Sequence, residues 1–320
     1  MLNSICATMN NKELKRLLQS KALKAQLTSL IDFELDTANK ILVMRITKRG
    51  MESNMQTDEG AFESWAIVLK YYLSDIISTV TICWEAQEID ERHPHITQFY
   101  YRLNKFRETY PWIRITQSIP EIPKVLLCNC PTKECASKDH YHEGSEGELE
   151  CDYVAENRSK YDCIDRQLPM GLFRDVISQE THFSPGNKSA IDIWAIKGND
   201  FYLFELKKQK NKPLGILSEI MYYTNVINDL LSHRINYERP EDSIKVKAAL
   251  NNDYRSFCEF YNNAYLKEST RKLNAVLLSD EIHPLITDGL LDFVNESPRW
   301  NSLNIKFSWK SISSSTSMGC

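Results

Sequence analysis

The chain has 320 residues, of which 42% are hydrophobic and 26% are charged, and its formal net charge is −4. This composition is typical of a soluble globular protein, and the length is enough for two domains of ordinary size. The slightly acidic charge excludes a general polyanion binder, so any contact with nucleic acid must come from local basic patches.

The start of the chain, MLNSICATMNNKELKRLL, has no signal-peptide core, and no stretch of the sequence is apolar for long enough to cross a bilayer. We therefore expect a cytoplasmic protein. The nine cysteines are irregularly spaced. An odd number of cysteines without an export signal favours free thiols or metal ligands over a disulfide framework.

Residues 1–125 are expected to form an N-terminal α/β domain. Strands are predicted at residues 31–35, 41–47 and 79–84, with one helix before the third strand and another after it. No catalytic constellation stands out in this part of the chain. We interpret it as a sensor, specificity or assembly domain of unknown role.

Residues 126–152 are expected to link the two domains, and they contain a cluster of sulfur and imidazole side chains. The candidate zinc ligands are Cys128, Cys130, Cys135, His140 and His142. Thiolates and imidazoles are the donors that zinc favours, but the spacing matches no common zinc-finger pattern. A structural zinc ion and a loop with free thiols both stay open.

The most informative segment is SAIDIWAIKGNDFYLFELKK, which begins at Ser189. Two runs of apolar, aromatic and β-branched residues flank a Lys-Gly-Asn-Asp turn, which predicts a β-hairpin. If Gly198 and Asn199 form the loop, Asp192 faces Glu205 across the ladder. The two carboxylates then share one face of the hairpin.

Lys207 is predicted to project on the same face as Glu205, because side chains alternate along a strand. A solvated pair on an exposed sheet face is the ordinary interpretation of such charges. Here apolar residues occupy both faces of the hairpin, and charges are rarely buried without partners. A divalent cation bound by Asp192 and Glu205 would supply the missing positive charge.

This pattern, an acid on one strand and Glu-x-Lys on the next, resembles the PD-(D/E)XK nuclease superfamily. Ile191 stands where the family name has proline. The resemblance implies a restriction-endonuclease-like core in residues 153–320, a mixed sheet flanked by helices in the order helix, three strands, helix, strand. The expected fold class is therefore α/β with two domains.

The remaining elements of that core are assigned from the flanking sequence. A helix is predicted at residues 161–178, a second at 214–231 and a strand at 273–278. In the superfamily the helix after the Glu-x-Lys strand often adds a polar residue to the site. This makes Glu219 the fourth candidate, with Tyr223 behind it.

The function that the resemblance implies is metal-dependent hydrolysis of phosphodiester bonds by a nuclease. Asp192 and Glu205 would hold Mg²⁺ or Mn²⁺, Lys207 would position the attacking water, and Glu219 would add a ligand through water. DNA is favoured over RNA as the substrate, and endonucleases of microbial restriction, repair or defence are the implied setting. The competing hypothesis is a non-catalytic module that binds nucleic acid or protein and keeps the fold.

A basic run follows the Glu-x-Lys strand and contains Lys208, Lys210 and Lys212. It is expected either to contact phosphates or to form a solvated loop. The sequence leaves open the type of cleavage, the sequence preference and whether the chain forms a homo-oligomer.

Overall fold

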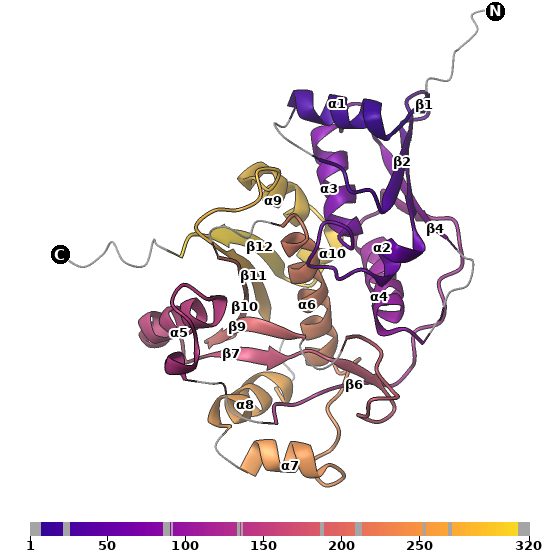
Figure 1. Cartoon of the computed structure of the whole chain (residues 1–320). Helices are drawn as coiled ribbons and strands as arrows, with labels where there is room; N and C mark the ends of the chain where they lie inside the picture. The colour runs from indigo at the N-terminus through magenta and orange to yellow at the C-terminus, as the bar shows by residue number, and fades with distance from the viewer. Residues whose placement is uncertain are drawn as a thin grey trace, which may run out of the picture. The chain divides into compact units, whose positions relative to one another are not determined.

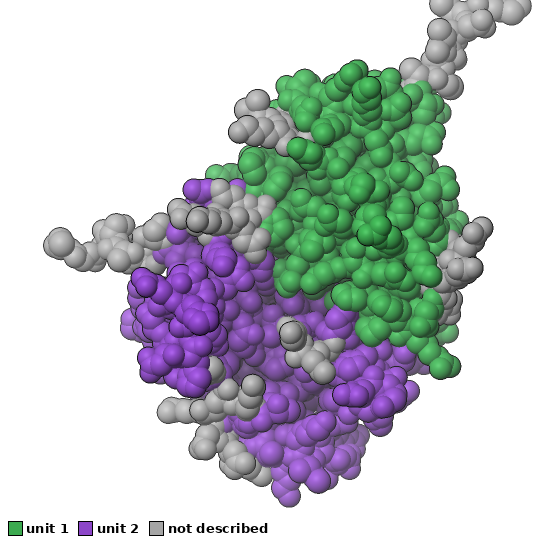
Figure 2. All heavy atoms as spheres, in the orientation of Figure 1, with its two compact units in different colours: residues 1–121, 213–219, 283–301 green, residues 122–212, 220–282, 302–320 purple. Residues whose placement is uncertain are grey.

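The structure is a computed structural model (Figure 1), and it describes residues 8–21, 26–85, 90, 92–132, 135, 137–185, 189–208, 213–251, 254–267 and 271–312. The chain divides into two compact units (Figure 2). Unit 1 comprises residues 1–121, 213–219 and 283–301, and unit 2 comprises residues 122–212, 220–282 and 302–320. The fold is α/β, with mixed sheets flanked by helices. None of the helices in the described ranges is long and apolar enough to span a membrane.

Unit 1 is built on a five-stranded sheet in the order β1-β2-β3-β4-β5. The pairings of β1 with β2 and of β2 with β3 are antiparallel, whereas β3 with β4 and β4 with β5 are parallel. The elements of unit 1 are β1 (Thr8–Met9), α1 (Asn11–Lys21), β2 (Ile31–Asp36), β3 (Ile41–Ile46), α2 (Lys48–Glu52), α3 (Phe62–Tyr72), β4 (Thr79–Trp84), α4 (Pro94–Thr109), β5 (Ile113–Ile115) and α9 (Asp288–Asn295). The three strands predicted in this region are confirmed.

Unit 2 contains a second five-stranded sheet, in the order β12-β11-β10-β9-β7. Strand β9 pairs antiparallel with β7 and β10, whereas β10 with β11 and β11 with β12 are parallel. The elements are β6 (Leu126–Cys128), η1 (Lys138–His140), α5 (Glu146–Asn157), η2 (Arg158–Lys160), β7 (Cys163–Pro169), β8 (Leu172–Arg174), β9 (Ala190–Lys197), β10 (Asp200–Leu206), α7 (Ile244–Asn251), α8 (Arg255–Phe260), η3 (Tyr261–Tyr265), β11 (Lys272–Leu278) and β12 (Ile305–Lys310). Helices α6 (Ile216–Leu231) and α10 (Pro298–Ser302) have residues in both units.

The β9–β10 hairpin has the predicted register. Asp200 pairs with Lys197 next to the turn, and Phe204 pairs with Ile193 at the far end of the ladder. Gly198 has a φ of +57°, a backbone conformation that glycine adopts without a steric penalty. The prediction of a hairpin with this loop is confirmed.

The sheet of unit 2 is covered on both faces. On one face, Tyr153 and Val154 of α5 belong to a core cluster with Ile193 and Phe204. On the other face, Phe260 packs edge-to-face against Trp194, with ring centroids 5.6 Å apart. Because both faces are dry, a charged side chain on this hairpin needs a protein or ligand partner.

The predicted helix at residues 161–178 is wrong, because this segment forms β7 and β8. Ile164, Leu168 and Leu172 recur every fourth residue and so resemble a helix face. In the structure, β7 instead alternates between half-buried and buried side chains, and it ends at Pro169. The helix that precedes the hairpin sheet is α5.

Candidate functional site

The register of the unit 2 sheet aligns three polar residues from three neighbouring strands. The β7–β9 pairs on either side of Gln167 place it opposite Asp192. If the β9–β10 register continues one pair beyond its last partners, Asp192 faces Glu205. Gln167 and Asp192 therefore lie opposite each other, and Glu205 comes one position after the last paired residue of β10.

Strands β9 and β10 separate at this position. The ladder ends before Asp192, whose Oδ2 accepts a hydrogen bond from the backbone N–H of Leu206 at 2.8 Å. The N–H of Lys207 donates to the carbonyl oxygen of Leu278 on β11 at 3.0 Å. The Asp192 carboxylate thus takes the place of a strand partner just beyond the end of the β9–β10 ladder.

The two predicted acids and the lysine lie together at this point. Lys207 Nζ is 2.6 Å from Glu205 Oε1 and 4.0 Å from Asp192 Oδ2. Glu205 is 1% exposed and Lys207 is 7% exposed, whereas the Asp192 side chain is 19% exposed. Two carboxylates and one ammonium group thus lie close together, and charges interact more strongly when water is excluded.

A third acid, Glu150 on α5, lies in the electrostatic field of Asp192 and is not among the site residues predicted from the sequence. Glu150 is 4% exposed. Gln167 Nε2 donates to both of its carboxylate oxygens, at 3.1 and 3.0 Å, and Arg166 Nη1 lies 3.8 Å from Oε2. Burial, and secondly the charge of Asp192, raises the pKa of Glu150 to about 7, although Gln167 and Arg166 act in the opposite direction.

A sequence signal for α5 was present. Ser145 and Glu148 have the spacing of a capping box, and the Ser145 hydroxyl accepts a hydrogen bond from the Glu148 N–H. This pattern predicts a helix start, which would have placed Glu150 in the first turns of a helix.

Gln167 has an unusual backbone conformation for a strand residue. Its φ is +53°, in the left-handed region that costs a residue with a side chain on the order of 1 kcal/mol. The amide of Gln167 donates to the Glu150 carboxylate from this conformation. Strain of this kind is typical of positions where a side chain is aimed at a functional site.

Glu219 and Tyr223 are both buried in α6, at 1% and 2% exposure. Glu219 Oε1 accepts a hydrogen bond from Gln56 Nε2. Glu219 belongs to unit 1, and Tyr223 belongs to unit 2. It stays a prediction that either of them joins Asp192 and Glu205, which we call the acidic pair.

Of the basic run, Lys208 is exposed, and its backbone N–H lies 3.4 Å from Glu146 Oε1. Lys210 and Lys212 lie outside the described residues. Phosphate binding by this run stays a prediction.

The cysteines of the proposed zinc segment lie in different surroundings. Cys128 is buried in β6, and its Sγ donates to the carbonyl of Pro169 at 3.5 Å, whereas the Sγ of Cys135 donates to the carbonyl of Arg166 at 3.4 Å. Burial raises the pKa of Cys130 and of Cys135 to about 11. With pKa values in this range, Cys130 and Cys135 are neutral thiols at neutral pH when no metal is bound.

The two histidines of that segment are exposed. His140 lies in η1 with its Nδ1 2.9 Å from the Ser137 hydroxyl, and His142 follows it. Among the residues that the structure describes, no three His, Cys, Asp or Glu side chains are placed to hold a metal ion. A zinc ion bound by this segment therefore stays a prediction.

The acidic pair nevertheless fits a hard divalent cation. Mg²⁺ commonly binds one or two protein carboxylates and completes its shell with water and phosphate oxygens. Asp192 and Glu205 offer carboxylate oxygens on neighbouring strands, and the raised pKa of Glu150 reflects a third carboxyl group in the field of Asp192. Converging, poorly hydrated carboxylates favour a bound cation.

Comparisons of the chain with protein-family models, with curated proteins and with solved structures found no match.

Proposed function

We propose that the chain is a metal-dependent nuclease whose unit 2 is a restriction-endonuclease-like domain of the PD-(D/E)XK type. The observation that carries the proposal is the grouping of Asp192, Glu205 and Lys207 where β9 and β10 separate. Two acids and a lysine with this spacing can bind a metal and a phosphodiester together.

The order of the elements in unit 2 supports the same proposal. Helix α5 is followed by strands β7, β9 and β10, then by α6 and by β11, if η2, β8, α7, α8 and η3 are counted as insertions. This is the helix, three strands, helix, strand order that the resemblance implies. In this proposal units 1 and 2 correspond to two domains, and unit 1 serves in specificity, sensing or assembly.

Each residue of the site has a role that follows from its surroundings. Asp192 and Glu205 would hold Mg²⁺ or Mn²⁺. When bound, the ion would lower the pKa of a water molecule and polarise the phosphodiester. Lys207, held by Glu205, donates a hydrogen bond to the attacking water and offsets the negative charge that grows on the phosphate.

Glu150 adds a group that exchanges protons near neutral pH. In this proposal Glu150, with a pKa of about 7 in the metal-free protein, would accept the proton of the attacking water, because a general base is most efficient when its pKa is near the working pH. Gln167 holds both oxygens of this carboxyl group and so orients it.

The proposed substrate is nucleic acid, with DNA favoured over RNA, in microbial restriction, repair or defence. The experiment is a cleavage assay on supercoiled plasmid, linear duplex, single-stranded DNA and RNA, with Mg²⁺ or Mn²⁺ and with EDTA. We expect cleavage that requires the metal and disappears in Glu205→Gln. Binding without cleavage under every condition would instead support the non-catalytic module.

A matched control comes from the other sheet. Glu34 is an exposed carboxylate on a hairpin strand of unit 1, so Glu34→Gln removes the same charge from a strand that lacks the acidic pair. Cleavage that is lost equally in both variants would show that the assignment of the site is wrong.

A further inference from the structure

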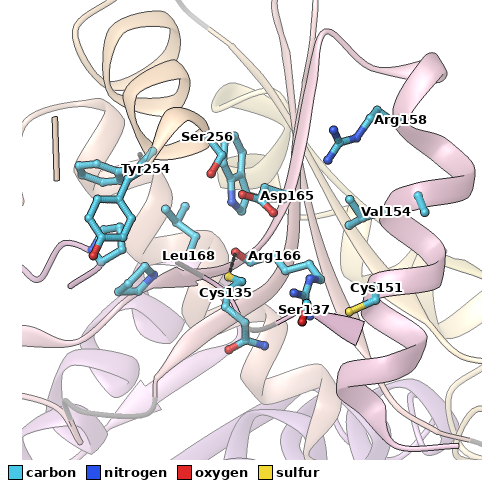
Figure 3. A pocket seen from close by; sticks show the side chains of 16 residues that line it. Cys135, Ser137, Cys151, Val154, Arg158, Asp165, Arg166, Leu168, Tyr254 and Ser256 are labelled. Carbon is cyan, nitrogen blue, oxygen red and sulfur yellow. Dashed lines mark hydrogen bonds between the residues drawn. The ribbon is translucent and has the colours of Figure 1, made fainter. Parts of the chain in front are cut away.

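A cavity of about 510 Å³ lies along the outer edge of β7, between α5 and the start of α8 (Figure 3). Strand β7 is an edge strand of its sheet, so its outer side is free of a neighbouring strand in the described part of unit 2. The volume is within the range of sites that bind small molecules.

One part of the cavity wall is aromatic and apolar. Trp194 of β9 contributes to it, and Tyr254 and Phe257 contribute from the start of α8. Trp194 is held in place by the ring of Phe260. Trp194 and Phe257 are each 2% exposed, whereas Tyr254 is half-buried, so Tyr254 is the ring that a planar ligand can reach.

Two charged side chains face the cavity from different elements. Arg158, the first residue of η2, extends towards β7, and Asp165 of β7 lines the cavity together with Ser256 of α8 (Figure 3). Arg158 is exposed and Asp165 is half-buried. Neither side chain forms an ion pair or hydrogen bond with another residue in the described ranges.

The other polar groups in the wall contribute little charge. Arg166 is paired with Glu150 at 3.8 Å. Burial raises the pKa of Cys135 to about 11 and also raises the pKa of Cys151, so both side chains are neutral thiols. Among the described lining residues, the cavity thus offers the guanidinium group of Arg158, the carboxylate of Asp165 and aromatic rings to a ligand.

We propose that this cavity binds a guanine nucleotide through its base and its 5′-phosphate. The carboxylate of Asp165 accepts hydrogen bonds from N1–H and the 2-amino group of guanine, two adjacent donors that match two carboxylate oxygens. The guanidinium of Arg158 donates to the phosphate, and the ring of Tyr254 stacks on the base. Adenine and cytosine place a ring-nitrogen acceptor beside their amino group, which a carboxylate repels.

The inference rests on the proposed function, because it assigns the nucleotide to the strand that unit 2 would cut. Gln167 lines the cavity and donates to both oxygens of Glu150, whose pKa responds to Asp192. Gln167 therefore contacts both the cavity and the Glu150 carboxyl group. An unpaired guanosine near the scissile bond is the expected preference, since a base inside a duplex cannot enter the cavity.

The test measures binding of GMP by calorimetry and by quenching of tryptophan fluorescence, with the full chain carrying Glu205→Gln in EDTA. Cleavage cannot interfere under these conditions. GMP is expected to bind at least tenfold more tightly than each of three competitors. These are IMP, which lacks the 2-amino group, AMP, which has a different base, and guanosine, which lacks the phosphate. Equal affinity for GMP, AMP and IMP, or no binding of GMP at millimolar concentration, would overturn the proposal.

Two variants assign the contacts. Asp165→Asn is expected to remove the preference for GMP over IMP, and Arg158→Gln the preference for GMP over guanosine. Arg107→Gln, on an exposed position of α4 in unit 1, is the matched control and should leave both ratios unchanged. If neither ratio changes in the cavity variants, GMP binds elsewhere and the assignment fails.

A 5′-phosphorylated single-stranded oligonucleotide containing guanine distinguishes a nucleic-acid strand from a free nucleotide. It is expected to bind with the same dependence on Asp165 and Arg158, and a fully paired duplex is expected to bind at least tenfold more weakly. Binding of GMP but not of the oligonucleotide would overturn the assignment to a strand. If the protein cleaves nucleic acid but does not bind GMP, only the guanine-nucleotide inference is wrong. If it binds GMP but does not cleave nucleic acid, only the proposed function is wrong.

Discussion

The sheets of the two units have the same strand arrangement. In unit 1 the β2–β3 hairpin lies between an antiparallel edge strand, β1, and two parallel strands, β4 and β5. In unit 2 the β9–β10 hairpin lies between the antiparallel edge strand β7 and the parallel strands β11 and β12. The connections differ, because α1 lies between the first two strands of unit 1, whereas β8 lies between β7 and β9.

Both hairpins carry facing charges near the end that is distant from the turn. In unit 1, Asp32 pairs with Arg45, and both are exposed. In unit 2, Asp192 and Glu205 follow the last pair of the ladder, and Glu205 is 1% exposed. Water satisfies the charges of the first hairpin, but those of the second require Lys207 and, in our proposal, a cation. Burial, and not charge spacing alone, separates a candidate site from an ordinary strand surface.

The largest effect is expected when an acid of the buried hairpin is replaced, and this effect is on catalysis. Asp192→Asn should reduce cleavage by about a thousandfold, because a neutral amide holds the metal and its activated water far less well. The rate is measured as plasmid nicking under single-turnover conditions. Asp32→Asn, the counterpart on the exposed hairpin, should leave the rate unchanged. Equal rates for wild type and Asp192→Asn would place any nuclease activity elsewhere.

Removal of the lysine tests the cost of burial directly. Lys207→Ala should lower the free energy of unfolding by about 3–5 kcal/mol, because it leaves the buried carboxylate of Glu205 without its ammonium partner. Adding Glu205→Gln should recover much of this loss, as measured by urea unfolding of the single and double variants. Arg45→Ala should change stability by no more than about 0.5 kcal/mol. A similar small effect for Lys207→Ala would mean that the pair is solvated.

The third prediction concerns the pH dependence of stability. The raised pKa of Glu150 means that the folded protein binds a proton between about pH 4.5 and 7 that the unfolded chain has released. The contribution of this proton to the free energy of unfolding is complete below the pKa of Glu150 in the unfolded chain, 4.5, and is lost as the pH rises through about 7. In EDTA, Glu150→Gln should therefore be more stable than wild type at pH 8, by on the order of 2 to 3 kcal/mol, and similar at pH 4. Parallel stability profiles of the two proteins would contradict the raised pKa.

The smallest effect is expected from the metal alone. Mg²⁺ at about ten times its dissociation constant should raise the free energy of unfolding by about 1.4 kcal/mol, because it binds only the folded site. Thermal unfolding with Mg²⁺ and with EDTA measures this shift. Glu205→Gln should remove it, whereas Glu34→Gln should retain it. An identical shift in both variants would indicate binding outside the acidic pair.

The hairpin could be predicted from sequence because its signals are local. Alternating strands around Gly198 and Asn199 define the register, and the register brings Asp192 towards Glu205. The helix that carries Glu150 also has a local signal, the capping box of Ser145 and Glu148, although the surrounding segment has the composition of a linker. The helix predicted over β7 failed because a four-residue apolar spacing occurs by chance in a strand whose alternate residues are polar.

Other features of the site could not be predicted from a single sequence. The left-handed φ of Gln167 is imposed by its tertiary surroundings, since glutamine has no intrinsic preference for it. The cavity beside Asp165 depends on α8, which lies about ninety residues later in the chain. Such long-range proximities leave no local pattern of hydrophobic periodicity or turn residues.

The interleaved course of the chain has a consequence for any attempt to isolate the nuclease-like part. Residues 213–219 and 283–301 belong to unit 1 although they lie within the sequence of unit 2. A fragment that begins at residue 122 would retain these segments but lose residues 1–121, which form most of their unit. Apolar side chains such as Leu290 and Trp300, now fully buried, would then lack part of their packing. No single cut separates the units, so deletion studies should remove loops or change single residues instead of dividing the polypeptide.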